Sequence, residues 1–207
     1  MFGVENLLLF IGAGLLLNIT PGPDMLYVAT RSAMQGRSVG LISALAIGTG
    51  TLAHIAAAAF GLSTLLMVSA TAFQVVKWAG AVYLIYLGIR TFMTAGNQFE
   101  KQRLQPDSIG TIFREGVIVN VLNPKVALFF LAFLPQFVNT AESVLPQIIF
   151  LGFVFDFFGT LVLFVVALCF SRVGDVMQRH PRVQRAQKWV TGTVFITMGV
   201  MLGFAEK

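Results

Sequence analysis

The sequence Asn18-Ile19-Thr20-Pro21-Gly22-Pro23-Asp24 lies inside the first long apolar segment of the chain, where a helix would otherwise run without interruption. Each proline removes a backbone donor and crowds the carbonyl four residues before it, so we expect the helix to break here. Broken helices survive at membrane depth only where their free backbone groups face protein or a wet cavity, and many transporters build substrate sites in this way. The motif therefore predicts an internal binding site.

The composition of the chain indicates that this site lies in a membrane. Of its 207 residues, 57% are hydrophobic and 11% are charged, whereas about a quarter of the residues of a soluble domain are charged. The net charge of +5 is spread over short basic segments between apolar runs, without the basic and aromatic stripe of a nucleic-acid-binding surface, so we expect no nucleic-acid partner. Cys169 is the only cysteine, which excludes an internal disulfide and a thiolate metal cluster.

Six segments are apolar enough to be membrane-spanning helices, which need about 20 residues each. They cover residues 6–30, 40–66, 72–94, 113–138, 145–170 and 187–205. Lys and Arg residues gather in the connections that follow the first, third and fifth segments, while the other connections are nearly free of charge. The positive-inside rule therefore places these three connections in the cytoplasm and both termini outside.

The two halves of the chain resemble each other. Phe10 to Pro21 lines up with Phe113 to Pro124, and Lys77-Trp78 recurs later as Lys188-Trp189. Because each half has three predicted helices, the second half enters the membrane from the opposite side, and we predict inverted repeats whose broken helices meet near the midplane. The predicted organisation is an all-α membrane protein with a single domain over 1–207, made of repeat one (1–95), a linker (96–109) and repeat two (110–207).

Four ionisable side chains lie well inside the predicted spans: Asp24, His54, Lys125 and Asp156. A charge at the bilayer centre costs at least about 2.5 to 3.5 kcal/mol, so such residues are expected to face the protein interior and to have a function. Asp156 is flanked by phenylalanines on both sides. Since apolar surroundings disfavour a charged carboxylate, we expect Asp156 to bind and release protons near neutral pH. The alternative is a structural ion pair with Lys125.

The other three ionisable residues have structural interpretations as well. Asp24 begins the second half of the first broken helix, where it would cap that half, with or without a further function. Lys125 follows Asn123-Pro124 in the same way, and would pair with either aspartate or bind a substrate carboxylate. His54 occupies the same place in the first half as Asp156 does in the second. Hydrogen-bonded packing is the plainer interpretation of His54, and a functional role is the alternative.

Polar side chains around the two breaks complete the candidate site. They would either satisfy backbone groups freed by the prolines or bind a zwitterion directly, since the N-terminus of a half-helix favours a carboxylate and unwound carbonyls favour an ammonium. The candidate substrate and coupling residues are Asn18, Thr20, Pro21, Gly22, Pro23, Asp24, His54, Asn120, Asn123, Pro124, Lys125 and Asp156.

The motif at Asn18 to Asp24, continuing into Leu26-Tyr27-Val28, and the motif Asn120 to Lys125 within Gly116 to Leu128 resemble those of the LysE/RhtB family of amino-acid exporters. The resemblance extends over essentially the whole chain. It implies export of amino acids or close derivatives across the bacterial inner membrane, with protons as the coupling ion. It does not indicate which amino acid is exported. The family motif residues in this chain are Asn18, Pro21, Gly22, Pro23, Asp24, Asn120, Asn123, Pro124 and Lys125.

Two other classes of function are alternatives to an amino-acid exporter. A divalent metal-ion exporter of the same superfamily is the alternative, but it would need more buried carboxylates, histidines or thiolates than the predicted spans contain. An enzyme is not expected, because no nucleophile and base or metal triad is evident. The expected partners are therefore an amino-acid substrate, protons and the lipid bilayer, without a cofactor, and a homodimer is left open.

Overall fold

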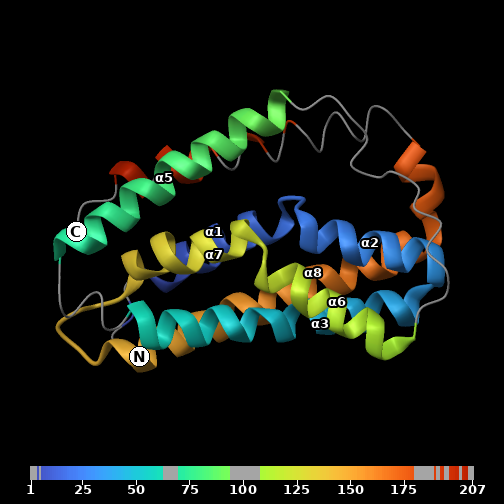
Figure 1. The fold of residues 1–207 in the computed structure, drawn as a ribbon, viewed down its shortest axis with the longest axis horizontal. Coiled ribbons are helices and arrows are strands. Elements are labelled where there is room, and N and C mark those ends of the chain that lie inside the picture. Colours follow the sequence, from blue (N-terminus) through green and yellow to red (C-terminus); the bar gives the residue numbers. More distant parts are fainter. Residues whose placement is uncertain are drawn as a thin grey trace.

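The computed structural model describes residues 4, 6–62, 70–93, 108–179, 189, 192–193, 196–200 and 202–204. These residues form helices and short connections without any β-strand, as Figure 1 shows. The predicted all-α class is confirmed. Most of the linker 96–109 and part of the sixth predicted span lie outside the described residues, so the division into repeats with a linker between them stays a prediction.

The first predicted span consists of two helices. α1 covers Leu7–Ile19 and α2 covers Pro23–Gln35, and the two are bent by 52° relative to each other. Gly22 precedes α2 in an extended conformation. Pro23 takes the first position of α2, where the missing N–H would have had no helical partner in any case. The predicted break at this motif is confirmed.

The fourth predicted span breaks in the same manner. α6 covers Ile109–Val121 and α7 covers Pro124–Leu128, followed by the π-helical turn η2, Phe129–Phe133, and the 3-10 turn η3, Leu134–Phe137. The helical segments before and after the break are bent by 43°. Hence the break predicted at Pro124 is also confirmed.

Three longer helices accompany the broken pairs. α3 covers Arg37–Ala57 and continues into the π-helical turn η1, Ala58–Leu62; α5 covers Ala70–Met93; α8 covers Val144–Arg179. Among the described residues, two helices are long and apolar enough to cross a membrane, or up to four if each bent pair counts as one span. The arrangement as six spans in two inverted repeats stays a prediction.

In the described part of the chain, large apolar side chains lie on the surface and several polar side chains are buried. Leu8 is 86% exposed and Phe157 is 66% exposed, whereas Asn120 and Lys125 are buried. A soluble monomer rarely exposes large apolar areas, and lipid is the surrounding that accepts such a surface. Because the apolar helices can also span the bilayer, the protein is a multi-pass membrane protein.

Two apolar clusters lie on either side of a polar layer. The larger one includes Phe10, Phe129 and Phe155, with the rings of Phe129 and Phe155 stacked at 4.4 Å between centroids. The smaller one includes Ile47 and Leu163. Along α1 and α2, along α3 and along α8, the polar side chains of the site fall between residues of the larger and of the smaller cluster. The site is therefore enclosed by apolar packing at both ends.

Candidate functional site

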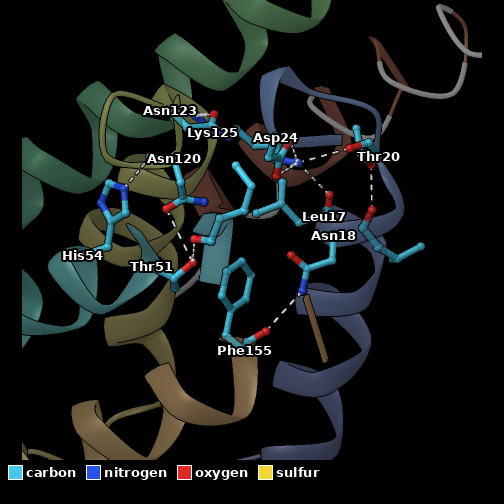
Figure 2. A network of polar contacts seen from close by, with 12 residues as sticks. Leu17, Asn18, Thr20, Asp24, Thr51, His54, Asn120, Asn123, Lys125 and Phe155 are labelled. Carbon is cyan, nitrogen blue, oxygen red and sulfur yellow. Dashed lines mark hydrogen bonds and ion pairs between the residues drawn. The ribbon is translucent and has the colours of Figure 1, made fainter. Parts of the chain in front are cut away.

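The ammonium group of Lys125 reaches into the break between α1 and α2, as Figure 2 shows. Its Nζ atom lies 2.9 Å from Oδ2 and 3.1 Å from Oδ1 of Asp24, and donates to the carbonyl oxygens of Thr20 at 3.1 Å and Leu17 at 3.5 Å. The side chain of Lys125 is 2% exposed and that of Asp24 is 8% exposed. Of the two aspartates proposed as its partner, Lys125 therefore pairs with Asp24, and a structural ion pair between Lys125 and Asp156 is not present.

The position of this ion pair follows from the electrostatics of the broken helix. The last carbonyls of α1 have no partner within the helix, and the negative end of its dipole favours a cation. Asp24 lies in the first turn of α2, where the positive end of the dipole favours an anion. Both charges thus lie at favourable helix ends, which offsets part of the cost of removing them from water.

Gly22 makes room for the ion pair. A Cβ atom at this position would lie 2.8 Å from Oδ1 of Asp24 and 3.1 Å from Nζ of Lys125. Real Cβ atoms essentially never come as close as the first of these distances, so a larger residue would displace the carboxylate. The glycine of the motif is therefore explained by the space that the two charged groups need.

The backbone groups freed by the second break have polar partners. Asn123 accepts a hydrogen bond from the backbone N–H of Lys125 at 3.0 Å and so caps α7. Nε2 of His54 lies 3.0 Å from the carbonyl oxygen of Asn120. When Nε2 carries a proton, His54 donates to this oxygen. The contact accounts for His54 as hydrogen-bonded packing, and a functional role for this histidine stays a prediction.

Asn18 and Thr20 stabilise the end of α1. The hydroxyl of Thr20 donates to the carbonyl oxygen of Leu16 at 2.6 Å. The amide nitrogen of Asn18 donates to the carbonyl oxygen of Phe155 on α8 at 3.4 Å. Both side chains thus donate to backbone oxygens, and Asn18 also lines the pocket described next.

A small polar pocket lies between the two broken helices, α3 and α8. We call it the inner pocket, and its polar side chains are Asn18, Asp24, Thr51, Asn120, Asp156 and Thr160. It has room for about one water molecule. An amino acid is several times larger, so a ligand of that size could bind here only if the helices moved apart.

Asp156 belongs to this pocket but not to the ion pair. It lies on α8 and is half-buried, with the side chains of Thr51 and Thr160 within hydrogen-bonding range of its carboxylate. Among the described residues, the ion pairs within the bundle join Lys125 to Asp24 and Arg31 to Glu115. The carboxylate of Asp156 thus has only neutral hydroxyls as partners within this part of the chain.

Comparison with known proteins identifies the family. A family model described as LysE type translocator matches residues 15–206. The chain belongs to this family. The resemblance to LysE/RhtB exporters is thereby confirmed, and both breaks and the inner pocket lie within the matched residues.

Similar proteins cover almost the whole chain. The homoserine/homoserine lactone efflux protein of Salmonella typhimurium is 32% identical over 191 residues, which is 92% of each chain. An uncharacterized membrane protein of Bacillus subtilis is 27% identical over 213 residues, covering 98% of this chain and 100% of its own. No solved structure matches the chain. Relatives named as an efflux protein and as a membrane protein thus align with almost the whole chain.

The structure of this LysE translocator brings most of the predicted site residues together. Asn18, Asp24, Asn120 and Asp156 line the inner pocket. Thr20 and Lys125 contact the ion pair or belong to it, while His54 and Asn123 contact the second break from outside the pocket. Pro21, Gly22, Pro23 and Pro124 contribute through the shape of the backbone.

The sequence interpretation missed Thr51 and Thr160. Both line the inner pocket of the translocator and approach Asp156. Thr160 follows Asp156 by one helical turn, a spacing that places two side chains on the same helix face, so it could have been found from the sequence. Thr51 lies in a segment rich in Gly, Ala, Ser and Thr that is typical of tight helix packing. Its polar role depends on the approach of α3 to α8.

The described residues also bear on metal binding. Within the parts of the chain that the structure describes, no group of three or more His, Cys, Asp or Glu side chains is placed to hold a metal ion. Hard divalent cations prefer several oxygen ligands and softer ones prefer imidazole or thiolate.

Proposed function

We propose that this protein exports amino acids or close derivatives across the inner membrane of a bacterium, in exchange for protons. The observation that carries the proposal is the polar inner pocket at two helix breaks in a LysE translocator, with the Lys125–Asp24 ion pair at its wall. The Salmonella relative is named an efflux protein for homoserine and homoserine lactone, which supports amino acids or their derivatives as the substrate class.

The charges around the inner pocket match the charges of such a substrate. Homoserine and its lactone share an amine, while only the free amino acid has a carboxylate. The amine would bind a carboxylate of the site, and Asp156 suits this role because its partners among the described residues are neutral. Lys125 would face the carboxylate or carbonyl of the substrate after the break opens. The ion pair with Asp24 meanwhile holds the side chain of Lys125 in place.

Proton exchange follows from the same carboxylate. When Asp156 is protonated it has no charge with which to bind an ammonium, and when an ammonium is bound the proton is disfavoured. The two ligands therefore compete for one group, and this competition couples their movements in opposite directions. Export of the substrate would thus be driven by protons that enter the cell.

Transport into everted membrane vesicles tests both parts of the proposal. With an acidic lumen, we expect accumulation of at least one labelled compound among homoserine, threonine, lysine and homoserine lactone, and collapse of this accumulation by a protonophore. Accumulation that is unaffected by the protonophore would reject proton exchange but would still support export. Accumulation of Mn²⁺ alone in parallel vesicles would reject the amino-acid substrate in favour of a metal ion.

A further inference from the structure

A groove between α3 and α8 opens on the outer face of the bundle. It has a volume of about 420 Å³, and its walls include Leu45 and Leu52 from α3 and Phe153, Phe157 and Leu161 from α8. All five of these side chains are exposed, and large exposed apolar side chains in a membrane protein face lipid. We call this feature the side groove.

The side groove and the inner pocket share a wall. Gly48, Asp156 and Thr160 line both of them. A Cβ atom on Gly48 would lie 2.6 Å from Oγ1 of Thr160 and 3.3 Å from Oδ1 of Asp156. The absence of a side chain at Gly48 therefore keeps this wall thin, so that the carboxylate of Asp156 borders both spaces.

The chemistry of the side groove selects one class of ligand. Asp156 is the one ionisable side chain among the ten residues that line it, and the hydroxyls of Thr49 and Thr160 are the other polar side chains. A carboxylate in apolar surroundings favours a cation that can take the place of water. The exposed walls favour an apolar tail. A free zwitterion would bring a second charge, for which the side groove has no partner.

We propose that the side groove binds amphiphilic primary amines, which enter from the bilayer and place their ammonium group against Asp156. This inference rests on the proposed function, because it extends the substrate class from polar amino acids to amine-bearing derivatives with an apolar tail, such as amino-acid esters. These compounds partition into lipid and would reach the export site from the side. Polar amino acids would reach the same carboxylate through the inner pocket.

Fluorescence quenching in lipid nanodiscs tests the side groove directly. The chain has two tryptophans, so Trp78→Phe and Trp189→Phe leave Phe157→Trp as the source of the single indole signal. The quenchers are a nitroxide-labelled dodecylamine and the nitroxide-labelled alcohol of the same length. We expect the amine to quench several-fold more strongly than the alcohol at equal membrane concentration, and to saturate. With Asp156→Asn added, quenching by the amine should fall to the level of the alcohol.

Two further variants serve as controls. Val165→Trp places the indole on an exposed part of α8 outside the residues that line the side groove, where amine and alcohol should quench equally. Leu161→Trp repeats the measurement within the side groove where Phe157→Trp does not fold. Equal quenching by amine and alcohol in the side groove, or no change with Asp156→Asn, would overturn the inference.

The outcome separates this inference from the proposed function. A protein that exports homoserine but shows no preference for the amine would overturn only the inference about the side groove. A protein that binds the amine in the side groove but accumulates no amino acid in everted vesicles would overturn the proposed function alone.

Discussion

At the scale of single residues, the ion pair between Lys125 and Asp24 joins the two halves of the chain. It lies at the end of α1 and the start of α2, while Lys125 comes from α7. Removing one member of a buried pair costs more than removing both, because a charge without a partner stays behind in a poorly solvated place. The pair is thus expected to be worth more to the specificity of the fold than to its net stability.

Replacing Lys125 alone should destabilise the protein by about 3 to 5 kcal/mol. The carboxylate of Asp24 would lose its cation and would be left with the dipole of α2. The double variant Lys125→Gln with Asp24→Asn should recover most of this loss, since it removes both charges. Thermal unfolding of the single and double variants in detergent measures the difference. A double variant as unstable as Lys125→Gln would contradict a coupled pair.

Replacing Asp156 should leave the stability of the protein intact and reduce its export activity. An amide is nearly isosteric with a carboxylate and is less costly to bury, so Asp156→Asn should insert and fold at least as well as the original protein. It should lose proton-driven export by at least tenfold, because the group can no longer change its charge. Everted vesicles measure the export, and unfolding temperature measures the fold.

Glu142→Gln is a matched control for this change, since Glu142 is exposed in the connection before α8. It should export normally. If Asp156→Asn kept its export rate and its pH dependence, Asp156 would not be the group that carries the proton. Asp24 or His54 would then be the candidates for that role.

At the scale of helices, the breaks follow from local chemistry and the contacts between them do not. A proline inside an apolar segment removes a hydrogen bond wherever the segment packs, so both breaks could be predicted from the sequence. That Lys125 reaches Asp24, and that Thr51 approaches Asp156, depends on how residues distant in sequence come together. Composition and spacing do not determine this packing, so the sequence alone does not identify which aspartate pairs with Lys125.

Gly22→Ala tests the geometry of the first break. The added methyl group would meet the carboxylate of Asp24 at 2.8 Å, so we expect a loss of about 1 to 3 kcal/mol, as for other overpacked sites. Gly12→Ala is the matched control within α1, since nothing lies within 4 Å of its added Cβ, and alanine should be neutral or stabilising there by up to about 1 kcal/mol. Thermal unfolding compares the two. Equal stability of both variants would show that Gly22 is not needed for space.

At the scale of the whole molecule, the two broken pairs, α3 and α8 are arranged around one polar layer between two apolar clusters. The membrane class could be predicted because composition alone decides it. The inverted relation of the repeats stays a prediction, with which the matching breaks at Pro21 and Pro124 agree. The shared wall at Gly48 could not be predicted, because a glycine in a small-residue segment is most often there for packing.

The orientation of the molecule in the membrane provides the last prediction. In Figure 1, the end of α2, the start of α6 and the end of α8 lie toward one end of the long axis, while the start of α1 and residues 202–204 lie toward the other. The basic connections that adjoin the first three should be cytoplasmic, which puts both termini outside. A reporter fused after Lys207 should therefore be active only outside the cytoplasm, and one fused at Arg103 only inside. If both reporters were active in the cytoplasm, an even number of spans would separate Arg103 from Lys207, and the two halves could then not be inverted repeats of three helices each.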